Sequence, residues 1–284
     1  MRRYIKAIFH ELDDWIEANT ERTSNLLLFS VIYSEDFMVQ YMDECLVKMY
    51  KVVLQNKNKV ISRNVRLSFK FIGRYCLPYT YEKMIIPAIS NELASCFAHT
   101  QPGAIRGFGY LFRGAIEMLP ESELFNKVES LLAGFMKAIK DHVADALDLE
   151  LAEILVGSLN EIVTSLLEKQ SAGVDPSWLI RPYLKDILQF ALKSLAAFQS
   201  YKLQNKAEPD NVVEAKKLTK ELIGKLDELA EPSEQSFFDT NISQIIADTF
   251  AIKRSEHLSG MSLQAPAWRM FYALFDYLTA EHLQ

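Results

Sequence analysis

The sequence predicts an all-α fold in which helical hairpins stack into an α-solenoid. The 10 Gly and 9 Pro residues make up about 7% of the chain, against roughly 12% in average composition, which disfavours a β architecture with many turns. Apolar residues recur at steps of three and four almost everywhere, which is the period of an amphipathic helix rather than of a strand. Hydrophobic residues account for 49% of the 284 positions, so the chain can bury a sizeable core.

The first half of the chain divides into a helix and hairpins at short polar or proline breaks. An unpaired helix is expected over 1–18. The acidic break Ser34-Glu35-Asp36 divides 20–54 into two helices. A polar run then leads into 56–97, which Leu77-Pro78 divides in the same way.

The same unit continues to the end of the sequence. Pro120 divides the hairpin at 100–140, a Gly-Val-Asp-Pro run divides 145–199, and Pro232 divides 209–253. A last unpaired helix is expected over 264–284. First helices recur on average about every 49 residues, near the ~40–47 of HEAT and armadillo units. The predicted fold class is therefore an α-solenoid of HEAT/armadillo-like helical hairpins, with 1–284 as one array.

Both terminal helices are rich in aromatic residues, where solenoid ends usually carry polar caps. We therefore expect a fragment of a longer array, or ends covered by a partner. These aromatic residues are Trp15, Trp268, Phe271, Tyr272 and Phe275.

Two internal features indicate how hairpins pack. Pro87 and Pro182 lie in similar apolar surroundings, which suggests a bend shared by two second helices; two unrelated helix starts are the alternative. The glycines around Gly107 and Gly114 resemble half of a dinucleotide fingerprint, but no strand precedes them. Close packing between neighbouring first helices explains them better. Trp15 and Phe112 are expected to be buried between hairpins.

No motif for catalysis, a cofactor or a metal ion emerges. His10-Glu11 begins like a zinc-protease motif, but Asp14 stands where the second histidine belongs. Cys45, Cys76 and Cys96 are isolated in apolar stretches and are interpreted as buried thiols in a reducing compartment. We expect no enzyme activity, no cofactor and no metal.

The charge distribution disfavours nucleic acid and anionic lipid as partners. The net charge is −6, with no basic block, so nucleic acid and anionic lipid have little electrostatic support. The sequence has no secretory signal and no apolar run long enough for a membrane span. A cytoplasmic protein that binds other proteins is expected. Its candidate protein-interaction residues are Lys83, Glu92, Arg181 and Lys185.

Short motifs in the first hundred residues carry a more specific resemblance. Glu11–Trp15, Arg22–Leu27, Ser34–Asp36 and Phe71–Ile86 follow one another at spacings similar to those of the HEAT-repeat dynein axonemal assembly factor, in its C-terminal half. The resemblance is best over about 8–95. It implies a non-enzymatic cytoplasmic scaffold for preassembly of axonemal dynein arms, with dynein chains, chaperones or other assembly factors as partners.

A general HEAT-repeat scaffold is the alternative, of the tubulin-binding TOG-like, transport or phosphatase-regulatory type. The turns inside the hairpins are acidic or neutral, as in Ser34-Glu35-Asp36 and Cys76-Leu77-Pro78. The acidic surface of tubulin would repel such a ridge, so TOG-like binding is disfavoured.

Overall fold

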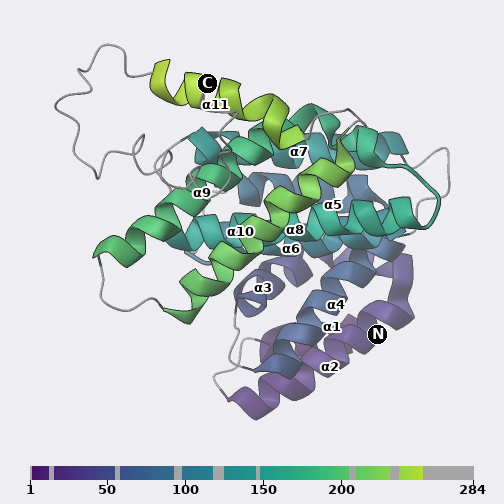
Figure 1. The fold of residues 1–284 in the computed structure, drawn as a ribbon. Helices are drawn as coiled ribbons and strands as arrows, with labels where there is room; N and C mark the ends of the chain where they lie inside the picture. Colours follow the sequence, from purple (N-terminus) through teal and green to yellow (C-terminus); the bar gives the residue numbers. More distant parts are fainter. Residues whose placement is uncertain are drawn as a thin grey trace. The chain divides into compact units, whose positions relative to one another are not determined.

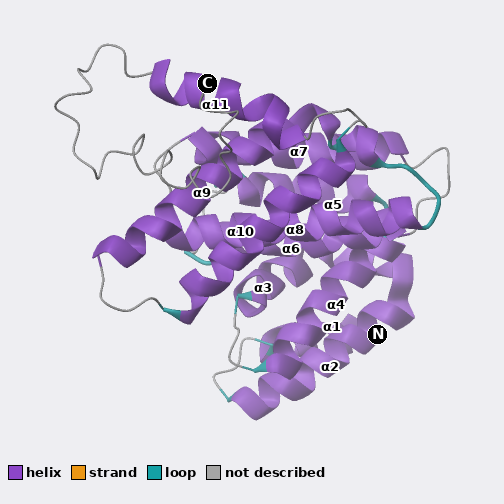
Figure 2. Ribbon diagram, viewed as in Figure 1, coloured by secondary structure: helices purple, strands orange, loops and turns teal. Residues whose placement is uncertain are grey.

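Helices dominate the computed structural model, which describes residues 2–12, 16–54, 58–92, 98–117, 125–144, 148–204, 209–230 and 237–251. No strand occurs in these ranges (Figure 2). The predicted fold class, an all-α helical solenoid, is confirmed. None of the described helices is long and apolar enough to cross a membrane. The chain divides into two compact units, 1–141 with 164–176, and 142–163 with 177–284.

The first unit contains the helices of the first three predicted hairpins. They are α1 (Arg2–Glu11), α2 (Glu17–Ser34), the 3₁₀ helix η1 (Glu35–Tyr41), α3 (Met42–Val53), α4 (Lys59–Tyr75), α5 (Pro78–Ile89), α6 (Thr100–Glu117) and α7 (Phe125–Ala144), the last as far as residue 141. The last turns of α8 (Leu149–Ser171), from residue 164, also belong to it.

Helix α4 shows how the sequence specifies these elements. The Asn58 side chain accepts hydrogen bonds from the backbone N–H groups of Val60 and Ile61, at 2.9 and 3.2 Å, and so caps the helix. Four of its apolar residues recur at helical spacing and are fully or almost fully buried. They are Ile61, Val65, Phe69 and Ile72. The next hairpin helix, α5, starts with Pro78 at a position where no N–H is needed.

The first helices of successive hairpins stack on one another: α2 packs on α4, and α4 on α6 (Figure 1). We call α2, α4 and α6 the first-helix row. Between α4 and α6 the backbones approach closely, because a Cβ on Gly114 would overlap the Lys70 carbonyl and one on Gly73 would overlap the Leu111 carbonyl. A Cβ on Gly107 would lie 2.6 Å from the Phe69 ring. The prediction that these glycines permit close packing of first helices is confirmed.

The second unit is built from the first part of α8 together with α9 (Leu184–Gln204), α10 (Asp210–Leu229) and α11 (Phe237–Ala251). The short 3₁₀ helices η2 (Ser177–Leu179) and η3 (Arg181–Tyr183) precede α9. Its core includes a cluster of Ala152, Phe198, Val212 and Ala215, with Leu149 against it. Lys225 Nζ donates to Asn160 Oδ1 at 2.8 Å and joins α10 to α8.

The structure differs from the prediction in three local features. Helix α2 begins at Glu17, inside the range 1–18 predicted for the first helix. The second helix of the first hairpin starts as the 3₁₀ helix η1, because Glu35 adopts a φ of +46° just after α2. The prediction that Pro87 and Pro182 cause the same bend in two second helices is wrong. Pro87 lies in the last turn of α5, whereas Pro182 lies in η3, before α9.

Other predictions fall outside the described residues. Trp15, Cys96 and the helix expected over 264–284 belong here. The organisation of 1–284 as one array, and as a fragment of a longer one, stays a prediction.

Candidate protein-interaction surface

The buried cysteine and tyrosine side chains of the first unit are part of its packed core. Cys45 and Cys76 are buried, as predicted, and burial raises the pKa of both thiols, that of Cys76 to about 12. Burial likewise raises the pKa of the Tyr50 and Tyr81 hydroxyls above their ordinary range. A thiol held protonated is a poor nucleophile. Across the described ranges, no group of three His, Cys, Asp or Glu side chains is placed to hold a metal ion.

The four residues predicted to contact proteins fall in two pairs. Lys83 is exposed on α5, and Glu92 is exposed three residues beyond the end of that helix. Arg181 is half-buried in η3, and Lys185 is exposed at the start of α9. The first pair belongs to the first unit and the second pair to the second unit. The two pairs are therefore treated as separate candidates, and the role of all four residues in binding stays a prediction.

Two neighbouring hairpin turns carry a surface that the sequence analysis missed. The Cys76 Sγ donates to the Glu35 carbonyl oxygen at 3.7 Å, so the start of η1 touches the turn before α5. Phe37 and Tyr79, just after these turns, are 69% and 54% exposed, and Leu77 is also exposed. Such large apolar side chains in the open are typical of contact sites.

We call this surface the turn ridge, defined by Glu35, Asp36, Phe37, Leu77 and Tyr79. Lys83 follows Tyr79 by four residues on α5 and so lies on the same face of that helix. The turns were predicted to be acidic or neutral from the residues at the breaks themselves, such as Ser34-Glu35-Asp36 and Cys76-Leu77-Pro78. The aromatic residues just beyond them resembled ordinary buried helix positions, and helical spacing alone does not show which of them a neighbour covers.

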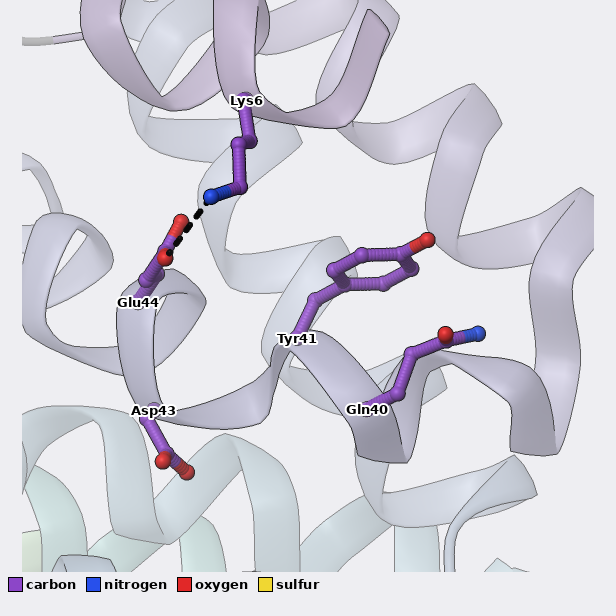
Figure 3. A pocket seen from close by; sticks show the side chains of 5 residues that line it. All are labelled: Lys6, Gln40, Tyr41, Asp43 and Glu44. Carbon is purple, nitrogen blue, oxygen red and sulfur yellow. Dashed lines mark ion pairs between the residues drawn. The ribbon is translucent and has the colours of Figure 1, made fainter. Parts of the chain in front are cut away.

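A small polar hollow lies between α1, η1 and α3 (Figure 3). Its volume is about 300 Å³. Lys6 Nζ is 3.7 Å from Glu44 Oε1, and both side chains are more than half exposed, so this ion pair contributes little stability. Figure 3 shows the Asp43 carboxylate directed away from Lys6. The hollow therefore has no convergent set of polar groups, which a specific ligand site needs.

Comparisons with known proteins bear on the first unit. Residues 1–133 match the family model described as the HEAT-repeat domain of dynein axonemal assembly factor 5. Over 107 residues the chain is 25% identical to dynein axonemal assembly factor 5 from Xenopus laevis, a match that covers 38% of this chain and 13% of that relative. No solved structure matches. The resemblance stated for about 8–95 lies inside the family match and is confirmed.

Proposed function

We propose that this chain is a non-enzymatic cytoplasmic scaffold for the preassembly of axonemal dynein arms, because residues 1–133 match the model of the HEAT-repeat domain of dynein axonemal assembly factor 5. Its partners in this proposal are dynein chains, chaperones or other assembly factors. The family match is the observation that carries the proposal. The matched relative is named as an assembly factor, and a stack of helical hairpins offers an extended surface suited to holding proteins.

The turn ridge and α5 form the binding surface in this proposal. They lie within the matched 1–133, whereas Arg181 and Lys185 lie outside it. Exposed Phe37 and Tyr79 provide the apolar contact that dominates most interfaces. Lys83 and Glu92 are both exposed, on α5 and just beyond its end, and α5 also carries Tyr79. They add charges at the rim, which affect the association rate more than the affinity.

Co-purification from ciliated cells tests this function. We expect the full chain to recover a dynein heavy or intermediate chain, or a chaperone, identified by mass spectrometry. The double variant Phe37→Glu/Tyr79→Glu should reduce that recovery about tenfold, because charge is forced into the apolar centre of the contact. Val213→Glu is a matched control, since Val213 is also 50% exposed but lies on α10 in the second unit.

Two results count against the proposal. Wild-type chain that recovers none of these proteins contradicts the assembly role, and equal recovery by the double variant contradicts the turn ridge as its surface. Tight, salt-sensitive co-sedimentation with tubulin that the double variant abolishes supports the TOG-like alternative instead.

A further inference from the structure

Helix α4 carries a stripe of basic side chains along its outer side. The helix has five basic residues and no acidic one. At 3.6 residues per turn, all five fall within a sector of about 80° on the side away from the buried Val65. They are Lys59, Arg63, Arg66, Lys70 and Arg74. Because they are dispersed along the sequence, they form no basic block there, and only the helix brings them to one side.

This stripe lies outside the contacts that stack the first-helix row. On one side of α4, the Asn64 amide donates to Ser24 Oγ of α2 at 3.1 Å. On another side, a Cβ on Gly73 would overlap the Leu111 carbonyl of α6. Both positions beside α4 in the row are therefore filled, so a further hairpin stacked on either end of the row would not cover the stripe.

Helix α6 widens the basic surface. Arg66 lies over the Tyr110 ring of α6, 5.6 Å from its centroid, and Arg106 lies one turn before Tyr110 on the same side of that helix. Stacking on a ring holds a guanidinium in place while its N–H groups stay available to a carboxylate. Four arginines of α4 and α6 have no carboxylate partner among the described residues. We call these four the basic face: Arg63, Arg66, Arg74 and Arg106.

Carboxylates border the basic face and limit its length. Glu117 Oε1 of α6 is 2.6 Å from Lys70 Nζ, so it neutralises that cation. At the start of α4, Glu17 and Glu21 of α2 accept hydrogen bonds from the Asn58 side chain. A long polyanion such as nucleic acid, or an anionic membrane, would meet these carboxylates and a chain of net charge −6, whereas a short acidic segment meets mainly the arginines.

We propose that the basic face binds a short acidic segment of a partner protein. The axial distance from Arg63 to Arg74 is about 16 Å, which is the length of about five residues of extended chain. Arg106 adds charge across the ~9 Å between packed helices. Guanidinium groups bind carboxylates through paired hydrogen bonds, so a segment with Asp or Glu at alternate positions matches this surface. The basic face shares no residue with the turn ridge, and the proposal does not depend on a role in dynein arm assembly.

Fluorescence anisotropy of the full chain tests the proposal with two labelled peptides of about eight residues each. One peptide alternates Glu with Ser, and the other alternates Gln with Ser. We expect only the glutamate peptide to bind, and its affinity should fall about threefold between about 50 and 200 mM NaCl, because salt screens exposed charges. Arg63→Gln/Arg74→Gln should weaken binding about fivefold. Its circular dichroism spectrum should not change, since both side chains are exposed.

Lys137→Gln/Lys140→Gln is the matched control. Both lysines are exposed on α7 in the same unit, and this variant loses as much positive charge as the arginine variant does. It should bind the glutamate peptide as tightly as the wild type. Equal binding of the two peptides, no binding of the glutamate peptide at low salt, or equal losses in the two double variants would overturn the proposal. Displacement of the peptide by a short DNA duplex or by phosphatidylserine vesicles at the same charge concentration would also overturn it, because the face would then prefer polyanions in general.

Discussion

The close contact between α4 and α6 predicts that replacing one helical glycine by alanine lowers the free energy of unfolding, the opposite of the usual effect. Gly114 lies inside α6, where alanine normally stabilises a helix by about 1 kcal/mol relative to glycine. Here the added Cβ would overlap the Lys70 carbonyl of α4. This obstacle is backbone, so no side-chain rotation relieves it, and the two helices must separate.

The magnitude follows from two opposing terms. Overpacking that shifts backbone costs about 1–3 kcal/mol, and we take the upper end because a carbonyl is the neighbour. Subtracting the helix-propensity gain of about 1 kcal/mol leaves a net loss of about 2 kcal/mol for Gly114→Ala. Urea unfolding monitored by circular dichroism measures it, as a lower transition midpoint.

Two other helical glycines provide matched controls. A Cβ on Gly134 of α7 would lie 3.4 Å from Ile86, an ordinary contact, and one on Gly224 of α10 would meet nothing within 4 Å. Gly134→Ala and Gly224→Ala should therefore stabilise the chain by about 0.5–1 kcal/mol.

A double variant tests whether the close approach of the two backbones causes the loss of stability. Gly73→Ala should cost about as much as Gly114→Ala, but the two together should cost less than the sum, because helices that have separated once accommodate both methyl groups. Stabilisation by Gly114→Ala, or full additivity of the pair, would refute the close contact of the two backbones.

Three further predictions concern the same unit. Phe112 is fully buried, with its ring 6.1 Å from that of Phe108, so Phe112→Ala should lower the free energy of unfolding by about 3–5 kcal/mol, and an unchanged thermal melt would contradict its position. Asn64 donates to Ser24 and Asn25 of α2; Asn64→Ala should cost about 1–3 kcal/mol in urea unfolding by leaving buried groups unpaired, and a smaller loss would mean that water replaces these bonds. Burial raises the pKa of Cys76 to about 12. The Cys76 thiol ionises near pH 9 in the unfolded chain but only near pH 12 in the folded one, so raising the pH from about 9 to 12 favours unfolding. This one thiol should lower the free energy of unfolding by about 1.4 kcal/mol per pH unit across that range. Cys76→Ser should remove this contribution, and identical alkaline profiles of the variant and the wild type would contradict it.

The sequence was sufficient for the helices and for part of their packing. Apolar spacing predicted the described α-helices, though not the 3₁₀ helices η1, η2 and η3, and the glycines of α6 predicted close packing of first helices. The same spacing failed to reveal which apolar residues of α2 stay exposed, because α2 carries apolar residues on two sides. Leu27 and Val31 are buried whereas Phe29 and Tyr33 are exposed, and only tertiary contacts distinguish the two sides.

Local backbone geometry explains the remaining differences. The break at residues 34–36 was predicted, but the positive φ of Glu35 and the 3₁₀ start of the next helix were not. A glutamate rarely adopts this conformation without support from surrounding structure. The sequence pattern around Pro182 resembled that around Pro87, yet one proline lies at the end of a helix and the other before one. Proline is well suited to the position of Pro182 ahead of α9, whereas Pro87 removes one backbone hydrogen bond inside α5. The similar apolar residues around the two prolines did not distinguish these positions.

The central claim is a role in dynein arm assembly, and it is tested most directly inside ciliated cells. After depletion of this protein, a density gradient of cytoplasmic extract measures whether axonemal dynein heavy and intermediate chains still sediment together. We predict that the two chains separate, and that wild-type protein restores the complex while Phe37→Glu/Tyr79→Glu does not. Co-sedimentation that persists at normal levels after depletion would contradict the assembly role.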